Sequence, residues 1–357
     1  MEDYRIDSHK LMLHPIRVAE WMQGKMVYPI NAEVGLAGAC NHRCIFCTVD
    51  YMGYGLEPLD KGMAHIRFQE MESKGLRSIL FAGTGEPLLN KDAPDIINDT
   101  KSMGVDIALS TNGVLFTEDI AKECMESISW IRFSTSAGTE ATYKKIHCGK
   151  DGDLERVFAN IYCASQIKRK YQLKTVLGVQ IVMIPENEDE IVMLAQKIKE
   201  LGADQFSVKS FAWQPLSASS VKGEFDRETY YDGHAQIVQE LESLNDENFR
   251  AVYRKNRMGK AKKGKCYTEC HAMPFHANID SAGNVWPCCT LIGMEGMCFG
   301  NLYENTFEEI WQGKQRERIM RKIAEMKLAE CPPDCRLDDM NQYLHELKHP
   351  NAHVNFI

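Results

Sequence analysis

Residues 40–47 read CNHRCIFC, which places Cys40, Cys44 and Cys47 on one short segment with the spacing C-x3-C-x2-C. Structural zinc sites generally have four ligands, often arranged in C-x2-C pairs. Three closely spaced thiolates instead suit a cubane iron–sulfur cluster in which one iron has no protein ligand. His42 lies inside the segment and is not expected to reach the same metal. The segment therefore predicts a cluster site with one open coordination position.

This segment resembles the cluster motif of the radical S-adenosylmethionine (SAM) superfamily. Phe46, directly before the last cysteine, matches an aromatic residue that contacts the adenine of SAM in that family. The resemblance implies that Cys40, Cys44 and Cys47 hold a 4Fe-4S cluster whose open iron binds SAM. Reductive cleavage of SAM would then give a 5′-deoxyadenosyl radical that abstracts a hydrogen atom from the substrate. The cofactors carry this chemistry, and the protein binds and orients them.

Polar and glycine-rich segments follow three of the predicted strands. The apolar strand Ser78–Ala82 runs into a GTGEP turn, in which glycine permits close backbone approach. This turn resembles the family's GGEP segment, which holds the SAM amino group, with Thr84 at a position where glycine is commoner. The ends of the next two strands resemble the family's groups that bind the ribose and carboxylate of SAM. The implied cofactor-binding residues are Gly83, Thr84, Gly85, Glu86, Pro87, Ser110, Asn112, Ser134 and Ser136.

Predicted strands and helices alternate between residues 33 and 215, which indicates an α/β fold with a parallel sheet. Helical patterns over residues 62–75 and 93–104 each end in glycine, the residue that commonly terminates a helix. Six strand–helix units are fewer than the eight of a closed barrel. The resemblance implies a partial (β/α)6 TIM-like barrel with its active groups at the carboxyl ends of the strands.

A second cysteine group lies near the end of the chain. Residues 277–289, ANIDSAGNVWPCC, predict a β-hairpin that can bring Cys270 and Cys288 to one metal site. Cys331 and Cys335, in CPPDC, can complete four ligands. The region resembles the SPASM/Twitch extensions of radical SAM enzymes, which implies a small cysteine-rich domain (β-hairpin plus helix) with an auxiliary 4Fe-4S cluster. A structural zinc site is the alternative, and either Cys289 or Cys298 can replace one of the four ligands.

The chain is expected to divide into five segments. Residues 216–265 include a run from Arg254 to Lys265 with seven basic residues and no acidic one, read as either a solvated linker or a phosphate-contacting patch. The expected segments are an N-terminal extension (1–32), a radical SAM partial barrel (33–215), a helical and basic connector (216–265), a Twitch/SPASM-like domain (266–345) and a C-terminal tail (346–357).

Composition and charge restrict the binding partners and the cellular location expected for this protein. The chain has 357 residues and a net charge of −8, which argues against nucleic-acid binding through the whole surface. It has no apolar run long enough to cross a membrane and no signal peptide at its N-terminus. Thirteen cysteines without an export signal indicate metal or redox chemistry in a cytoplasmic protein.

The resemblance leaves the substrate open. Only 39 residues precede Cys40, too few for the peptide-recognition domain common in peptide maturases. This favours a polar small molecule such as a sugar, cyclitol or sugar nucleotide, undergoing oxidation, epimerisation or rearrangement. The enzyme would then be of oxidoreductase or isomerase type and would use a flavodoxin- or ferredoxin-type electron donor. Cys148 is a candidate hydrogen-atom donor and Lys209 a candidate substrate contact. A peptide-modifying maturase and a non-catalytic metal-binding sensor are the alternatives.

Overall fold

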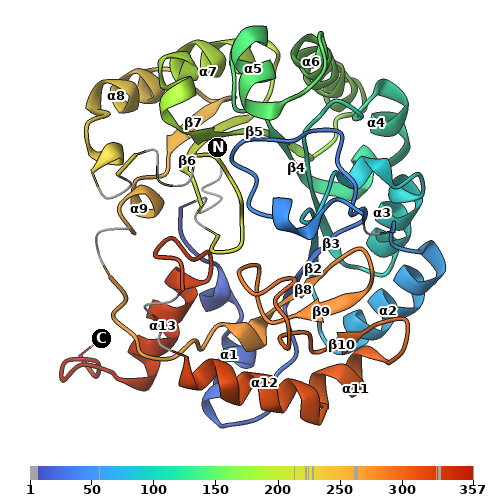
Figure 1. The fold of residues 1–357 in the computed structure, drawn as a ribbon, viewed down its shortest axis with the longest axis vertical. Helices are drawn as coiled ribbons and strands as arrows, with labels where there is room; N and C mark the ends of the chain where they lie inside the picture. The colour runs from blue at the N-terminus through green and yellow to red at the C-terminus, as the bar shows by residue number, and fades with distance from the viewer. Residues whose placement is uncertain are drawn as a thin grey trace.

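Seven parallel strands form the main part of the sheet in this computed structural model. The structure describes residues 7–55, 57–212, 214–221, 223, 225–226, 229–260, 264–326, 328 and 331–356. Each strand pairs with the next one along the chain, and helices cover the outer side of the curved sheet (Figure 1). The strands are β1 (Asn31–Val34), β2 (Ser78–Phe81), β3 (Asp106–Thr111), β4 (Ile128–Ser134), β5 (Val176–Met183), β6 (Gln205–Ser210) and β7 (Arg250–Tyr253).

The C-terminal hairpin extends the same sheet. Strand β8 (His276–Ile279) pairs in parallel with β1, and β9 (Asn284–Trp286) and β10 (Gly300–Asn301) follow in antiparallel order. The sheet order is β10-β9-β8-β1-β2-β3-β4-β5-β6-β7. The partial barrel and the hairpin predicted from the sequence are thus confirmed. The pairing of β8 with β1, and the strand β7 inside the expected connector, were not predicted.

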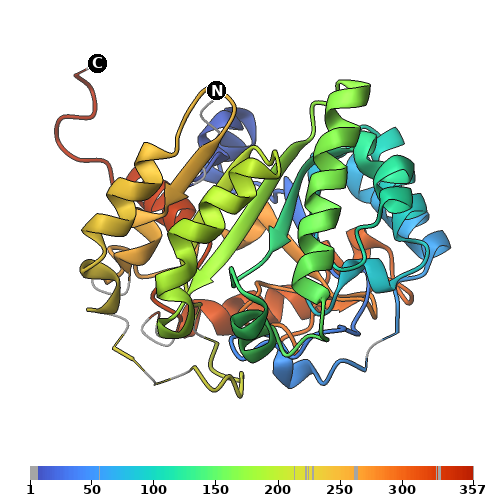
Figure 2. The same cartoon turned by 90° about the horizontal axis from the view of Figure 1, so that it is seen from above.

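The helices lie mostly between consecutive strands, as Figures 1 and 2 show. They are α1 (Pro15–Met22), α2 (Lys61–Ser73), α3 (Ala93–Ser102), α4 (Glu118–Cys124), α5 (Glu140–His147), α6 (Asp153–Tyr171), α7 (Ile191–Glu200), α8 (Ala235–Ser243), α9 (Lys255–Met258), α11 (Phe307–Gln312), α12 (Lys314–Glu325) and α13 (Asp338–Lys348). Short 3-10 turns are η1 (Leu11–Leu13), η2 (Asp50–Met52), η3 (Pro87–Leu89), η4 (Met125–Ser127), η5 (Pro185–Glu190), η6 (Tyr230–Asp232) and η7 (Met273–Phe275).

Local sequence signals explain where several helices begin and end. The side chain of Asp60 accepts a hydrogen bond of 2.8 Å from the backbone N–H of Met63 at the start of α2. The chain leaves α2 through Gly75, whose φ of +96° disfavours other residues. At α11, Thr306 and Glu309 form a reciprocal capping box, which satisfies backbone donors at the helix start.

The basic stretch of the connector makes several internal ion pairs. Arg254 lies 3.4 Å from a carboxylate oxygen of Asp7, and Lys260 pairs with both Asp338 and Asp339 at the start of α13. The Lys265 ammonium donates hydrogen bonds to three backbone carbonyls in the segment 328–332. Lys262 and Lys263 lie outside the described residues. The described basic residues named here therefore contribute to holding the C-terminal region in place.

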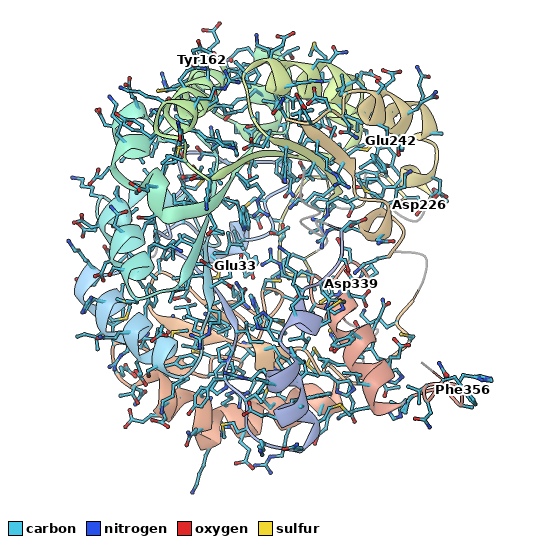
Figure 3. The ribbon with its side chains drawn as sticks, turned by 180° about the vertical axis from the view of Figure 1, so that it is seen from behind. Glu33, Tyr162, Asp226, Glu242, Asp339 and Phe356 are labelled. Carbon is cyan, nitrogen blue, oxygen red and sulfur yellow. The ribbon has the colours of Figure 1, made fainter. Side chains whose placement is uncertain are left out.

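Within the described ranges, no helix is both long enough and apolar enough to cross a lipid bilayer. The last residues of the chain extend away from α13 (Figure 1). Figure 3 shows Glu33, on β1, near the middle of the molecule and Tyr162, on α6, at its rim.

Trp311 connects the two ends of the chain. Its indole is 1% exposed, stacks on Phe307 with ring centroids 5.1 Å apart, and donates a 2.9 Å hydrogen bond from Nε1 to the carbonyl of Val27. The Arg316 guanidinium lies 4.1 Å from the ring centroid. One side chain therefore packs the segment before β1 against α11 and α12.

We predict that Trp311→Ala lowers the free energy of unfolding by about 3–5 kcal/mol, because it leaves a large cavity and an unsatisfied carbonyl. Urea unfolding followed by circular dichroism measures the change. Tyr162→Ala is the matched control, since that aromatic ring is 51% exposed, and it should shift the free energy by less than about 0.5 kcal/mol. Equal effects of the two substitutions would contradict the assignment.

Candidate functional site

The three N-terminal thiols lie in the loop that follows β1. Cys40, Cys44 and Cys47 all line a cavity of about 320 Å³ at the carboxyl ends of the strands. Burial raises the pKa of the Cys40 thiol to about 11, and the pKa of Cys44 is raised by burial and by its neighbours Cys47 and Cys40. Among the described residues, no three His, Cys, Asp or Glu side chains are arranged to hold a single metal ion. The chemistry of three thiols on one loop nevertheless suits an iron–sulfur cluster, which Cys40, Cys44 and Cys47 would hold.

His147, at the end of α5, contacts one of these three cysteines. Its Nε2 accepts a 2.9 Å hydrogen bond from the backbone N–H of Ser136, so the proton of the neutral ring resides on Nδ1. Nδ1 lies 3.2 Å from the sulfur of Cys44 and donates to it. Burial lowers the pKa of His147 to about 3, which keeps the ring neutral. Sequence reasoning missed this residue, whose only signal is its place next to Cys148 after the fourth strand.

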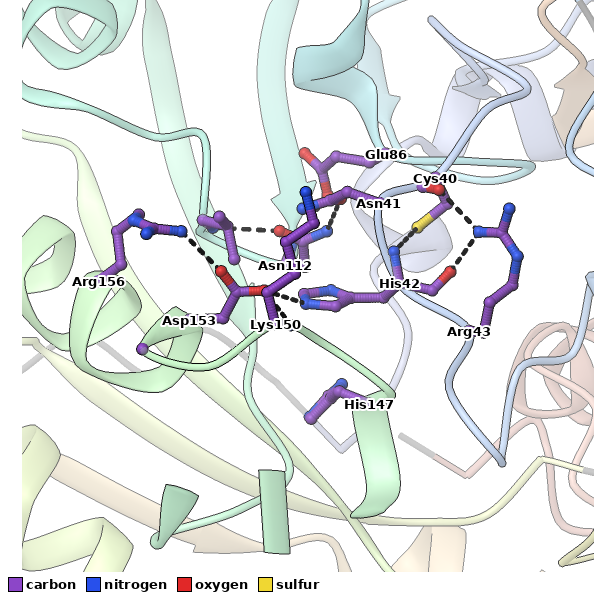
Figure 4. Close-up of polar contacts among 12 residues, drawn as sticks. Cys40, Asn41, His42, Arg43, Glu86, Asn112, His147, Lys150, Asp153 and Arg156 are labelled. Atoms are coloured by element: carbon purple, nitrogen blue, oxygen red, sulfur yellow. Dashed lines mark hydrogen bonds and ion pairs between the residues drawn. The ribbon is translucent and has the colours of Figure 1, made fainter. Parts of the chain in front are cut away.

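His42 holds the cysteine loop against α6 (Figure 4). Its Nε2 lies 3.4 Å from a carboxylate oxygen of Asp153, which also pairs with Arg156 at 2.6 Å. The backbone N–H of His42 donates to the sulfur of Cys40 over 3.5 Å, and Arg43 donates to the carbonyl of Cys40 over 2.7 Å. The loop is therefore fixed by its own backbone and by α6.

The Gly83–Pro87 segment packs directly against the cysteine loop. Glu86 is 2% exposed and its carboxylate accepts hydrogen bonds from the hydroxyl of Thr111 (2.6 Å) and the backbone N–H of Asn112 (2.8 Å). Burial raises the pKa of Glu86, while these hydrogen bonds act in the opposite direction. The backbone N–H of Glu86 donates to the carbonyl of Ala39 over 2.8 Å. Figure 4 shows Glu86, Asn112 and Cys40 converging from three segments.

The glycine-rich segment leaves no room for a side chain at Gly85. A Cβ atom there would overlap the carbonyl oxygens of Ala37 and Ala39. Gly83 and Gly85 line the cavity together with Glu86, whereas Thr84 and Pro87 are buried behind it. The buried hydroxyl of Thr84 has no hydrogen-bond partner among the described residues.

The predicted polar strand ends also face the cavity. Ser110, Asn112, Ser134 and Ser136 all line it, as does Phe46. The Asn112 amide donates to the Asn41 side chain over 2.6 Å, and the Ser136 hydroxyl accepts from the backbone of Val182. The Ser110 hydroxyl accepts two hydrogen bonds from the Arg132 guanidinium, at 3.0 and 2.9 Å.

The charges of the C-terminal thiols act on one another. The pKa of Cys335 is raised mainly by burial and further by Cys289, Cys270 and Cys331. The pKa of Cys288 is likewise raised mainly by burial and further by Cys289, Cys335 and Cys270. The Asn341 amide of α13 donates to the sulfur of Cys270 over 3.4 Å. Four thiols of this kind are a donor set whose chemistry suits a second cluster, which Cys270, Cys288, Cys331 and Cys335 would hold.

Two further cysteines differ in their surroundings. Cys289 lines the cavity beside Cys335, next to the four predicted ligands. The sulfur of Cys298 contacts the carbonyl of Gly300 at 3.4 Å, and the charges that influence its pKa are those of Asp280 and Glu304. Of the two possible replacement ligands, Cys289 is thus the nearer one.

The N-terminal thiols line the same cavity as Cys335 of the C-terminal group, whereas Cys270, Cys288 and Cys331 are not among the residues that line it. The segment after β6 joins the two regions. The Ser217 hydroxyl donates to the carbonyl of Cys47 over 2.8 Å, while the Gln214 amide donates to the carbonyl of Thr290 over 3.0 Å. The Tyr51 hydroxyl donates to the carbonyl of Ile292 over 2.8 Å. The cysteine loop and the C-terminal region are therefore bonded to each other around the cavity.

The structure separates the two candidate substrate-reacting residues. Lys209, on β6, lines the cavity. Cys148 ends α5 in a left-handed conformation (φ +50°), is exposed, and is not among the residues that line the cavity. Its sulfur lies 3.9 Å from the carbonyl of Lys145.

Comparison with known protein families gives two matches. Residues 35–198 match the radical SAM superfamily, and residues 266–336 match SPASM, an iron–sulfur cluster-binding domain. The chain is 25% identical over 326 residues to a tungsten-containing aldehyde ferredoxin oxidoreductase cofactor-modifying protein of Pyrococcus furiosus, covering 85% of this chain and 86% of that one. It is 30% identical over 228 residues to a probable GTP 3′,8-cyclase of Metallosphaera sedula, covering 62% and 68%.

Solved structures share the fold. Streptococcus suis SuiB bound to S-adenosylmethionine superposes with a TM-score of 0.68 at 15% identity, covering 95% of this chain and 79% of SuiB. Native anSMEcpe with bound AdoMet superposes with a TM-score of 0.57 at 15% identity, covering 87% of this chain and 88% of that one. At these identities the likeness concerns the fold alone.

We predict that Gly85→Ala destabilises the protein by about 1–3 kcal/mol, because the added methyl group forces the glycine-rich segment away from the cysteine loop. Urea unfolding of the protein without cofactors measures the change. Gly233→Ala is the control, since a Cβ atom there meets nothing within 4 Å and the φ is −81°. An unchanged unfolding midpoint for Gly85→Ala would show that the close approach is not required.

Proposed function

The chain belongs to the radical SAM superfamily, and we propose that it is a two-cluster enzyme that acts on a small polar molecule. Membership of this family, together with the SPASM domain, means that the protein binds SAM and iron–sulfur clusters. We assign the SAM-binding cluster to Cys40, Cys44 and Cys47. The auxiliary 4Fe-4S cluster is assigned to Cys270, Cys288, Cys331 and Cys335.

One observation carries this proposal: thiols of both groups line a single cavity. When bound at Cys40, Cys44 and Cys47, the cluster and SAM supply a 5′-deoxyadenosyl radical after one-electron reduction. A substrate bound in this cavity would lie near Cys40, Cys44 and Cys47 and near Cys335, and an auxiliary cluster held by the C-terminal cysteines would be able to accept one electron. This arrangement supports oxidation of the substrate.

The chain's own residues have distinct tasks in this proposal. The neutral His147 donates its Nδ1–H to the Cys44 sulfur and so stabilises the thiolate form of that ligand. Glu86, held by Thr111 and Asn112, fixes the segment assigned to the amino group of SAM. Ser110, Asn112, Ser134 and Ser136 offer hydroxyl and amide groups to the ribose and carboxylate.

The substrate class can be narrowed only in part. Relatives are named for GTP, heme and nucleotides, all non-peptide molecules. These names give no support to the carbohydrate-like substrate expected from the sequence, so we propose only a polar small molecule. Peptide modification is the second candidate, since SuiB, whose fold is similar, is also solved bound to its precursor peptide SuiA. Membership of this enzyme family argues against a non-catalytic sensor.

We further propose a cytoplasmic location and a flavodoxin- or ferredoxin-type electron donor. The reduced SAM-binding cluster needs a low-potential electron, and thiol ligands persist in a reducing compartment. Epimerisation and rearrangement are alternatives to oxidation, but the exposed position of Cys148 does not favour it as a hydrogen-atom donor.

We predict that Cys44→Ala abolishes SAM cleavage, because two thiolates do not hold the SAM-binding cluster. The measurement is 5′-deoxyadenosine formed by the anaerobically reconstituted protein with dithionite. Cys163→Ala, at a partly buried thiol on α6, is the control and should retain cleavage. Formation of 5′-deoxyadenosine by Cys44→Ala at the wild-type rate would refute the assignment.

We predict that Cys288→Ala halves the iron content, from about eight to about four per chain, and leaves SAM binding intact. Iron analysis and equilibrium dialysis with SAM test both parts. Cys298→Ala should keep the full iron content, because the sulfur of Cys298 contacts the carbonyl of Gly300 and the charges that act on it are those of Asp280 and Glu304. An iron content near four in the wild-type protein would contradict the auxiliary cluster.

A further inference from the structure

The end of helix α5 is bonded to the cysteine loop on both sides of Cys44. The backbone N–H of Arg43 donates to the carbonyl of His147 over 3.1 Å. The backbone N–H of Ile45 donates to the carbonyl of Ile146 over 2.9 Å. The side chain of His147 contacts the residue between these two donors, with Nδ1 3.2 Å from the sulfur of Cys44. Three contacts therefore fix the position of this thiol relative to α5.

The ring of His147 is enclosed by three other rings. It is 1% exposed, and its centroid lies 4.4 Å from that of Tyr143, one turn earlier on α5. The ring centroids of Phe46 and His42 lie 5.5 and 5.7 Å away. Side chains in a protein interior are close-packed, so the ring of His147 cannot turn away from Cys44 without displacing its neighbours.

The backbone of Ser136 determines which ring nitrogen of His147 carries the proton. The N–H of Ser136 points at Nε2 over 2.9 Å, and a backbone N–H can only donate. A proton on Nε2 would oppose that hydrogen, so the proton resides on Nδ1 and is donated to the sulfur of Cys44. Ser136 is itself held in place, because its hydroxyl accepts from the backbone of Val182 and its carbonyl accepts from the Asn187 amide.

We propose that His147 raises the reduction potential of the SAM-binding cluster through this N–H···S bond, and that Ser136 sets the tautomer on which the bond depends. The inference rests on the proposed function, because it needs a cluster at Cys40, Cys44 and Cys47. Hydrogen bonds to the sulfurs are among the factors that set the potential of an iron–sulfur cluster. The added electron makes the ligand sulfurs more negative, so a donor to sulfur stabilises the reduced cluster more than the oxidised one. His147 is thus a positioning residue that acts through Cys44.

Two amide substitutions separate the two hydrogen bonds of His147. The side-chain nitrogen of asparagine can take the place of Nδ1, so His147→Asn keeps a donor for Cys44. Glutamine is longer, and its side-chain oxygen can take the place of Nε2. His147→Gln therefore keeps the acceptor for Ser136 but loses the donor to Cys44. A role in packing alone would not distinguish the two variants in this direction.

The test is a redox titration of the anaerobically reconstituted protein, followed by electron paramagnetic resonance of the cluster whose signal changes on addition of SAM. We expect His147→Gln to make reduction of this cluster about three to ten times less favourable, which lowers its midpoint by about 30–60 mV for one electron. His147→Asn should stay within about twofold of the wild type. His234→Gln is the control and should titrate as the wild type does, because that buried ring pairs with Glu188 at 3.0 Å instead of with a sulfur.

A second measurement on the same cluster needs no variant. The protein is prepared with histidine that carries ¹⁵N only in the imidazole ring, and pulsed electron paramagnetic resonance is recorded on the reduced cluster. We expect a ¹⁵N coupling in the wild type and in His234→Gln that is lost in His147→Gln. The label is confined to the ring because the backbone N–H of His42 also donates to a ligand sulfur, that of Cys40.

Three outcomes overturn the inference: the wild type shows no ring-nitrogen coupling, His147→Gln has the wild-type midpoint, or His147→Asn falls as far as His147→Gln. Iron content and 5′-deoxyadenosine formation are measured on the same samples. If these are normal in the wild type while any of the three outcomes occurs, the inference fails and the proposed function stands. A wild-type protein that loads no SAM-binding cluster contradicts the proposed function itself. If His147→Gln does not load this cluster, the ¹⁵N coupling of the wild type decides.

Discussion

The parallel pairing of β1 with β8 is the contact on which the rest of the site depends. The four residues of β1 bond to β2 on one edge and to β8 on the other. Pairing with β2 joins β1 to the barrel, and pairing with β8 joins β1 to the hairpin that precedes Cys288. Because the cysteine loop begins directly after β1, the same strand positions both thiol groups. The single cavity that they share is a consequence of this arrangement.

Ionisable side chains of the same kind lie near one another at the cavity. Burying several charges of one sign is costly, so each such set needs a partner of opposite charge. Six of the seven assigned thiols, in the two cysteine groups, have pKa values raised by burial and, for most of them, by neighbouring thiols. Iron is the partner that we assign to them. Arg132, Lys209 and Arg257 line the same cavity.

The sequence predicted the features that local patterns encode. Three features each occupy one continuous stretch of sequence: the cysteine spacing, the GTGEP turn and the hairpin over residues 277–289. Each can therefore be recognised without a structure. The pairing of β8 with β1 joins residues about 245 positions apart, and no periodicity reports such a contact. Strand β7 is only four residues long and was overlooked between helical patterns. The contacts of His147, and the shared cavity of Arg132, Lys209 and Arg257, can be recognised only once separate strands and helices bring these residues together.

The β1–β8 pairing also sets the order in which the polypeptide can mature during synthesis. Until the ribosome has made residues 276–279, β1 has an unpaired edge, and exposed strand edges are where chains aggregate. Closing so long a loop is also slow relative to local folding. The barrel therefore keeps one open strand edge until the C-terminal hairpin has been synthesised and has paired with β1.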